Sequence, residues 1–321
     1  MVWNAVENQE CGQSIDDIKS AKRMRGRHVV KSGNVYMQSS GALMNIAETA
    51  LVDANDWWPE HITESAWLEH TPFAAWLMPA LQPKLLVELG THRAVSYMAF
   101  CQANAKLPIP AKCFAVDTWQ GDEHAGRYSE SIFQEVQNLN RPYGNFSTLL
   151  RSSFEDALVK FEDRSIDLLH IDGFHTYEAV SNDFYSWLPK MSQRGIVLFH
   201  DTEVRSKDFG VWRLWSEVSK KYPHFHFKHG FGLGVLGVGT SQSPQMRSLC
   251  DLVSEEKKYD EVRSVFSSRG KQVTARYQEM SEASAERRWW TPFYQSLKTT
   301  WRAAAPASVR EMAFKIRKKM D

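Results

Sequence analysis

The sequence predicts an α/β protein built on a Rossmann-like, doubly wound sheet. Short apolar runs alternate with segments of helical pattern in five strand–helix steps. Several of these runs end on an acidic residue, as they would where strands meet a ligand at one edge of a sheet. A final pair of apolar runs, Phe225–His229 and Leu233–Val238, is separated by a glycine turn. This pair predicts an antiparallel hairpin at one edge of the sheet.

The order of elements follows from the apolar periodicity. The expected strands are Leu85–Glu88, Lys112–Val116, Phe146–Leu150, Ile166–Ile171 and Gly195–Phe199. The expected helices are Val95–Ala105, Ser153–Phe161, Tyr177–Leu188 and Val211–Lys220, and residues 118–142 are expected to be part loop and part helix. The first strand runs through a turn at Gly90 into its helix. Such a turn places backbone N–H groups and a helix N-terminus where nucleotide-like ligands bind.

The chain divides by composition into three regions. Residues 1–40 form a polar N-terminal extension, residues 41–240 the α/β domain, and residues 241–321 a charged helical C-terminal region. Within the domain, residues 41–52 and 56–81 have helical spacing, with Thr71-Pro72 as a helix start. In the last stretch, apolar residues between Val309 and Met320 share one helical face opposite lysines and arginines. This helix packs on its own domain, which we favour, or lies on an anionic membrane surface, or docks on a partner.

Composition excludes several classes of protein. The 321 residues carry a formal net charge of +1, with 43% hydrophobic and 24% charged residues. These values are typical of a globular protein and give no reason to expect nucleic-acid binding. The four cysteines are scattered without CxxC spacing, and the N-terminus lacks an apolar signal-peptide core. We therefore expect a cytoplasmic protein.

The strand ends indicate which ligand the sheet binds. Glu88, Asp117, Asp172 and Asp201 each close a predicted strand, and loop solvation alone explains four such residues poorly. The turn at Gly90 lacks the full G-x-G-x-x-G pattern, which argues against a nicotinamide cofactor because a pyrophosphate needs that close backbone approach. An adenosine with a short charged tail, such as S-adenosylmethionine, fits the turn better.

Four blocks of the sequence carry a family resemblance. They are VELGTHRAVSYMAFC, AVDTWQGDEHAG, DLLHIDGFHTYEAVSNDFYSWLPKMSQRGIVLFHDT and GVWRLWSEV. Together they resemble class I S-adenosylmethionine-dependent methyltransferases, in particular the group similar to cephalosporin hydroxylase-type and macrocin O-methyltransferase-type proteins. Members of this group occur near, or fused to, bacterial glycosyltransferases. The resemblance covers about residues 57–239 and implies a seven-stranded sheet whose last two strands form a hairpin.

The resemblance implies a role for particular residues. Glu88, Gly90 and Thr91 would surround the methionine part of S-adenosylmethionine, and Ser96 would open the next helix. Asp117 would hold the ribose hydroxyls. The remaining predicted cofactor contacts are Thr118 and Trp119 beside the adenosine, Ser153 near the adenine, and Asp172 below the sulfonium.

In metal-dependent relatives, carboxylates at the ends of the fourth and fifth strands hold Mg²⁺, which positions an acceptor hydroxyl. Asp172 and Asp201 match those positions, but His200 stands where an acidic residue often precedes the second aspartate. His175 is the first candidate for the general base because histidine titrates near neutral pH. Alternatively, His175 caps the following helix or bonds a backbone carbonyl, and His200 is the base.

The resulting hypothesis is an O-methyltransferase that acts on a sugar hydroxyl in a bacterial surface glycan or its precursor. Expected partners are the small-molecule or glycan acceptor, a glycosyltransferase and a second copy of the chain. Peripheral contact with the inner face of the membrane through the basic C-terminal helix is an alternative to packing of that helix on its own domain. Two alternatives remain open: a hydroxylase-type oxidoreductase on the same fold, and a non-catalytic scaffolding partner of a glycosyltransferase complex.

Overall fold

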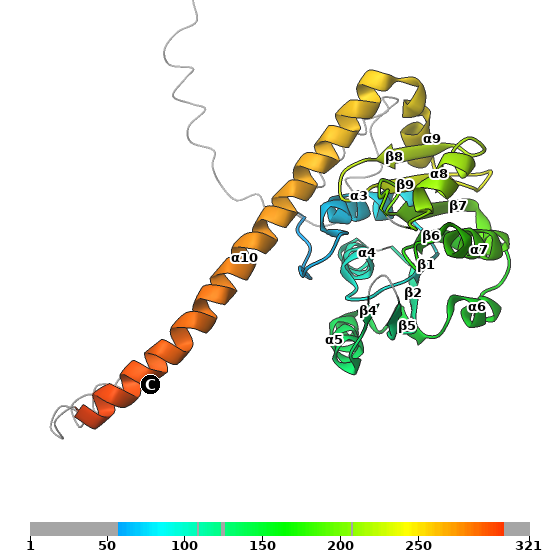
Figure 1. The fold of residues 1–321 in the computed structure, drawn as a ribbon. Coiled ribbons are helices and arrows are strands. Elements are labelled where there is room, and N and C mark those ends of the chain that lie inside the picture. Colours follow the sequence, from blue (N-terminus) through cyan, green and yellow to red (C-terminus); the bar gives the residue numbers. More distant parts are fainter. Residues whose placement is uncertain (1–56, 108, 123–125, 207, 305–321) are drawn as a thin grey trace, which may run out of the picture. The chain divides into compact units, whose positions relative to one another are not determined.

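A computed structural model describes residues 57–107, 109–122, 126–206 and 208–304, with side chains as far as residue 285. The chain separates into two units, Met1–Leu43 and Met44–Asp321, and all described residues belong to the second unit. This unit is organised around a seven-stranded sheet of order β5-β2-β1-β6-β7-β9-β8 (Figure 1). The predicted Rossmann-like sheet, with its terminal antiparallel hairpin, is confirmed.

The strands of this sheet are close to those expected. They are β1 Leu85–Leu89, β2 Lys112–Asp117, β5 Ser147–Arg151, β6 Ile166–Ile171, β7 Met191–His200, β8 His224–Phe227 and β9 Leu233–Gly237. The strands β5, β2, β1, β6 and β7 are parallel, whereas β9 runs antiparallel to both β7 and β8. A two-residue pair, β3 Gly121–Asp122 with β4 Gly126–Arg127, interrupts the segment expected to be loop and helix.

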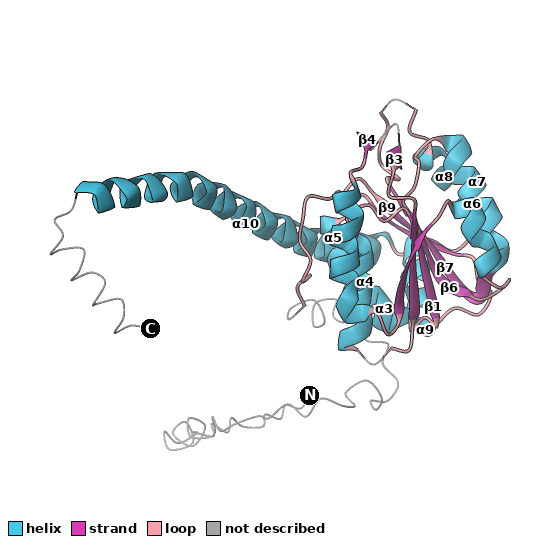
Figure 2. Cartoon of the chain, turned by 90° about the horizontal axis from the view of Figure 1, so that it is seen from below, coloured by secondary structure: helices cyan, strands magenta, loops and turns pink. Residues whose placement is uncertain are grey.

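Helices cover both faces of the sheet (Figure 2). The α-helices of the described residues are α3 Thr71–Leu81, α4 Val95–Lys106, α5 Glu130–Asn140, α6 Phe154–Ala157, α7 Tyr177–Trp187, α8 Val211–Val218, α9 Pro244–Asp251 and α10 Glu256–Ala304. Along β6, Leu168 packs with α3 and α4, while Leu169 packs with α7 and α8. This two-residue alternation divides the buried side chains between two cores.

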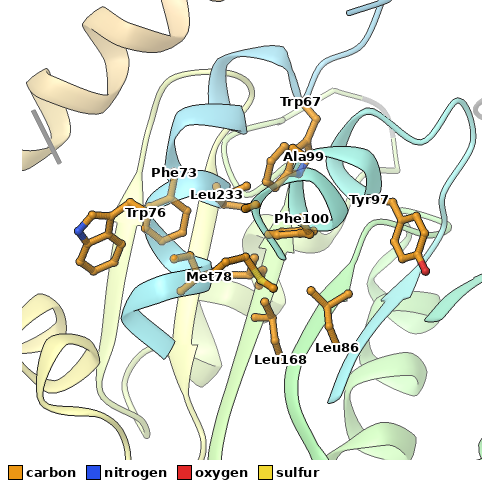
Figure 3. Close-up of a cluster of buried hydrophobic side chains, with 14 of the residues drawn as sticks. Trp67, Phe73, Trp76, Met78, Leu86, Tyr97, Ala99, Phe100, Leu168 and Leu233 are labelled. Carbon is orange, nitrogen blue, oxygen red and sulfur yellow. The ribbon is translucent and has the colours of Figure 1, made fainter. Parts of the chain in front are cut away.

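The larger core contains most of the buried aromatic residues (Figure 3). Trp67 and Phe100 pack edge to face with ring centroids 5.4 Å apart. Phe73 of α3 lies 4.8 Å from Phe227 of β8 and 5.4 Å from Phe266 of α10. The core therefore joins the helices that precede the sheet to the helix that follows it.

The C-terminal helices contribute to this same core. Met246 and Leu249 of α9 are fully buried in it, as are Val262 and Phe266 of α10. Gly270 of α10 allows a close approach, because a Cβ there would overlap the carbonyl oxygen of Glu69. Packing thus continues past residue 240 without interruption.

Some expected elements differ from the structure or lie outside it. The strand predicted from Gly195 begins at Met191, because Met191 pairs with Ile166 ahead of a bulge in the β6–β7 ladder. The predicted helix Ser153–Phe161 is a short α6 followed by a 3₁₀ turn. The N-terminal extension, the predicted helix 41–52 and the basic helix 309–320 lie outside the described residues. In the described part of the chain, no helix is both long and apolar enough to span a bilayer.

Candidate functional site

The turn after β1 brings three strand ends together. Gly90 adopts φ +85°, and a Cβ at this position would overlap the backbone carbonyl of Asp172. Its N–H donates to the carbonyl of Val116 at 3.0 Å, and the N–H of Asp172 donates to the carbonyl of Leu89 at 2.9 Å. Only glycine meets both the positive φ and the close approach. The carboxyl ends of β1, β2 and β6 therefore converge as predicted.

Asp117 organises this turn. One carboxylate oxygen accepts the backbone N–H groups of Thr91 and His92 at 2.8 and 2.9 Å. The other oxygen accepts the N–H of Trp119 at 2.7 Å. These three charge-assisted hydrogen bonds fix the turn in position before any ligand binds.

Trp119 also stabilises the turn after β1. Its side chain is buried, and its indole N–H donates to the carbonyl of His92 at 3.0 Å. Its ring packs against Phe133 at a centroid distance of 4.7 Å. The indole ring is therefore enclosed by protein, and the place of Trp119 beside the adenosine stays a prediction. Thr118 has its hydroxyl 3.2 Å from the N–H of Gln120.

Glu88 lies in the interior of the sheet. It lies opposite His170 in the β1–β6 ladder, and both side chains are fully buried. The indole of Trp67 donates to Nε2 of His170 at 3.0 Å, so Nδ1 of His170 carries a proton and donates to Glu88 at 2.8 Å. Burial raises the pKa of Glu88, although His170 and the hydroxyl of Ser96 oppose the rise. Oε2 of Glu88 thus bonds inside the sheet, and the contact of Glu88 with the methionine part of the cofactor stays a prediction.

The remaining predicted cofactor residues lie near the strand ends. Ser96 is buried in the first turn of α4, and Thr91 is buried in the glycine turn. Ser153 follows β5 and caps α6: its hydroxyl accepts the N–H of Asp156 at 3.1 Å and donates to the Asp156 carboxylate at 2.7 Å. Ser153 therefore already has a structural role.

A second cluster lies at the ends of β6 and β7. It consists of Asp172, His175, His200 and Asp201, with Asp201 at φ +59°. Nε2 of His175 is 3.0 Å from Asp201 and 3.7 Å from Asp172. The structure thus brings together both predicted metal ligands and both candidate bases.

His175 does not cap the next helix. Thr176 caps α7, since its hydroxyl accepts the N–H of Ala179 at 3.2 Å. The ring of His175 stacks on Phe209 at 4.7 Å with an interplanar angle of 7°. The stack orients Nε2 towards the two carboxylates, so the capping alternative is wrong.

His200 lies deeper than His175. Its Nδ1 is 3.2 Å from Asp172 and 3.3 Å from Asp201, and its Nε2 lies 3.2 Å from the carbonyl of Gly230. Nε2 of His70 lies 3.0 Å from the same carbonyl. The sequence offered no signal for this support, because a backbone carbonyl in a turn has no residue signature.

The two carboxylates make both imidazoles strongly basic. Burial disfavours the charged form of His175, but hydrogen bonds to Asp172 and Asp201 outweigh it and raise the pKa of His175 to about 10. For His200, burial is likewise outweighed by the charges of the same carboxylates, and its pKa rises to about 9. The imidazoles hold the pKa of Asp172 well below its usual range despite burial. Both histidines therefore carry protons at neutral pH when no cation is bound.

A protein family and a relative from Sinorhizobium fredii each match part of this chain. Residues 87–202 match the family described as "Methyltransferase domain". An uncharacterized protein, y4gI, of Sinorhizobium fredii is 51% identical over 191 residues, which are 58% of this chain and 21% of that protein. The match thus spans about a fifth of the relative's length.

Solved structures are similar at low sequence identity. A methyltransferase from Geobacter sulfurreducens is 13% identical, with a TM-score of 0.42 over 64% of this chain and 93% of that chain. The O-methyltransferase TomG of Streptomyces achromogenes, in complex with S-adenosylmethionine, is 12% identical, with a TM-score of 0.41 over 64% of this chain and 92% of that chain. The stretch that matches the methyltransferase domain family, residues 87–202, runs from β1 to the end of the Asp172–Asp201 cluster.

Proposed function

We propose that this protein is an S-adenosylmethionine-dependent O-methyltransferase. The observation that carries the proposal is the convergence of the glycine turn, Asp117 and the Asp172–Asp201 cluster at one edge of the sheet, within a methyltransferase domain. A cofactor at the turn and a hydroxyl at the cluster would lie beside each other. Methyl transfer depends mainly on such alignment of donor and acceptor.

For the cofactor, we assign the ribose hydroxyls to Asp117. Its oxygens already accept three N–H groups, which hold the carboxylate in one orientation, and a carboxylate oxygen can accept more than one hydrogen bond. Gly90 and Thr91 offer backbone at the methionine end. Ser153 and Thr118 remain proposed contacts of the adenosine. Glu88 in β1 and Ser96 in the first turn of α4 support the turn from the protein interior.

The Asp172–Asp201 cluster fits a divalent cation. One ligand atom each from Asp172, His175 and Asp201 lies within 4.8 Å of the others; Asp172 and His175 are partly exposed, and Asp201 is buried. When bound, a divalent cation would position the acceptor hydroxyl and favour loss of its proton. Mg²⁺ is the cation that the family resemblance implies.

The hydroxyl must lose a proton during transfer. His200 is 2% exposed at its side chain, so an acceptor cannot reach it, whereas His175 is 17% exposed. This leaves His175 as the candidate base. Asp172 and Asp201 stabilise the protonated form of His175. His175 can therefore accept the proton of the acceptor hydroxyl only when the negative charge of these two carboxylates is offset.

For the acceptor, we propose a sugar hydroxyl in a bacterial surface glycan or its precursor. Two exposed aromatic side chains near the cluster support this class: Phe231 is 58% exposed and Trp212 is 37% exposed. Phe231 follows Gly230, the carbonyl partner of His200, and the indole N–H of Trp212 donates to the carbonyl of Phe209 at 2.9 Å. Aromatic faces provide apolar surface on which the C–H face of a sugar ring can rest.

The setting in the cell also belongs to this proposal. We propose a cytoplasmic protein that works with a glycosyltransferase, forms homo-oligomers and contacts the inner face of the membrane through its basic C-terminal residues. The pattern of apolar and basic residues at 309–320 supports the membrane contact.

Transfer of a labelled methyl group tests the function. Methyl-tritiated S-adenosylmethionine is incubated with extracted surface glycans and their lipid-linked precursors, using wild-type protein and the Asp172→Asn variant. We expect label in a glycan fraction with the wild type and a loss of about a hundredfold with the variant. Equal labelling by both proteins would contradict the site, and no labelling of any fraction would contradict the proposed acceptor class.

A further inference from the structure

We propose that the cation site of this protein is a mixed nitrogen–oxygen centre, with His175 as a direct ligand beside Asp172 and Asp201. The inference rests on the proposed function for the place of the site. It replaces the general-base role of His175 with ligation, because a ring nitrogen that binds an ion has no lone pair left to accept a proton. It follows that the centre selects a first-row transition-metal dication, such as Mn²⁺, over Mg²⁺.

The distances between the donor atoms fit one ion. Ligand atoms about 2.1 Å from a metal and at right angles to each other lie about 3 Å apart. Nε2 of His175 is 3.0 Å from Oδ2 of Asp201 and 3.7 Å from Oδ1 of Asp172. A single ion between these atoms can contact all three side chains. It would take the place of the proton on Nε2 of His175, and that proton would leave to solvent.

The ring of His175 is held in the orientation that ligation needs. Its stack on Phe209 is nearly parallel, at 7°, and Phe209 pairs with Thr176 in an isolated β-bridge. The carbonyl of His175 accepts the N–H of Gly210 at 2.7 Å, which fixes its backbone. A ligand fixed at both backbone and ring loses little entropy when the ion binds.

His200 has a different role in this centre. Nδ1 of His200 contacts both carboxylates, and its Nε2 lies against the carbonyl of Gly230. It therefore positions Asp172 and Asp201 from the interior side, as outer partners of metal ligands commonly do. The position that often holds an acidic residue thus adds a hydrogen-bonding partner and no negative charge.

This donor set determines the preferred metal. Mg²⁺ prefers oxygen ligands in near-ideal octahedral geometry, whereas imidazole nitrogen favours transition metals. Two carboxylates and one imidazole give the site only two negative charges, which weakens its hold on Mg²⁺ further. Mn²⁺ accepts both oxygen and nitrogen donors, so it is the suitable probe.

The test measures metal binding to the full chain without cofactor or acceptor. Chelator-treated protein is titrated with MnCl₂ and MgCl₂, and pulsed electron paramagnetic resonance of bound Mn²⁺ detects coupling to a ligating ¹⁴N nucleus. The variants are His175→Gln, Asp201→Asn and His224→Gln. The last is a control on β8, where the His224 ring lies 3.2 Å from the carbonyl of Tyr222 and away from the centre.

We expect Mn²⁺ to bind at least about tenfold more tightly than Mg²⁺, with nitrogen coupling that His175→Gln removes. Asp201→Asn should weaken both metals, and His224→Gln should change neither. Bound Mn²⁺ without nitrogen coupling in the wild type would overturn the proposal and return His175 to the general-base role. Equal affinity for the two metals would also overturn it. The metal titration contains neither cofactor nor acceptor. Its result can therefore be interpreted even if the protein transfers no methyl group.

Discussion

Nε2 of His175 lies 3.0 Å from Oδ2 of Asp201. His175 comes from the loop after β6, and Asp201 comes directly after β7, so this contact joins the ends of two neighbouring parallel strands. It brings the candidate base and a candidate metal ligand to one point. The chemistry proposed for this protein depends on that contact.

A buried carboxyl on α7 should make stability depend on pH. Asp183 is 8% exposed, and burial raises its pKa to about 7. Because this pKa is above that of the unfolded chain, the folded state binds the extra proton, and stability falls as pH rises from about 4 to 7. In this range the wild type should lose up to about 1.4 kcal/mol of stability per pH unit because of Asp183. The variant Asp183→Asn should not show this loss.

Chemical unfolding of both proteins at several pH values checks this expectation. As the pH rises to about 7, the free energy of unfolding of Asp183→Asn should increase relative to that of the wild type. Above about pH 7, the difference between the two proteins should stay constant. Glu178→Gln, at an exposed position on the same helix, is the matched control and should track the wild type. A constant difference between Asp183→Asn and the wild type over the whole pH range would contradict the raised pKa that burial gives Asp183.

The buried chain from Trp67 through His170 to Glu88 should contribute measurably to stability. Trp67→Phe keeps an aromatic ring but removes the N–H that donates to Nε2 of His170. A buried acceptor left without its donor costs about 1–3 kcal/mol. Trp187→Phe, at a similarly buried indole in the other core, controls for the lost volume. If both variants unfolded at the same denaturant concentration, the hydrogen bond would contribute nothing.

The first turns of α10 should be part of the folding unit. Phe266 is 1% exposed and contacts Phe73, Trp76 and Phe227. Phe266→Ala should lower the free energy of unfolding by about 3–5 kcal/mol, because it leaves a cavity. Met280→Ala, at a position 50% exposed on the same helix, should change it by less than about 0.5 kcal/mol. A small effect of Phe266→Ala in thermal unfolding would show that α10 folds separately.

The sheet could be predicted from the sequence because its signals are local. Apolar runs such as Ile166–Ile171 are buried on both faces and end on an acidic residue, and both features are visible along the chain. For the same reason Asp172 and Asp201 could be placed together, since the ends of parallel strands share one edge.

Other features depend on contacts between distant residues. Glu88 looks like a ligand residue at a strand end, but His170 lies opposite it and turns its carboxylate inward. Trp119 follows Asp117 closely, but its ring is enclosed by Phe133. Residue type alone does not specify where a backbone carbonyl or an aromatic ring will lie. The contact of His200 with the carbonyl of Gly230 and the stacking of Phe209 on His175 therefore could not be predicted.

Binding of S-adenosylmethionine and S-adenosylhomocysteine, measured by calorimetry, tests the central claim most directly. Wild type, Asp117→Ala and Asp117→Asn are compared with and without a divalent cation, and circular dichroism confirms folding. We predict binding to the wild type that Asp117→Ala weakens at least tenfold, since three N–H groups of the turn lose their acceptor. Asp117→Asn keeps one acceptor oxygen and should fall between them. Failure of the folded wild type to bind either molecule would contradict the methyltransferase assignment and favour the scaffolding alternative.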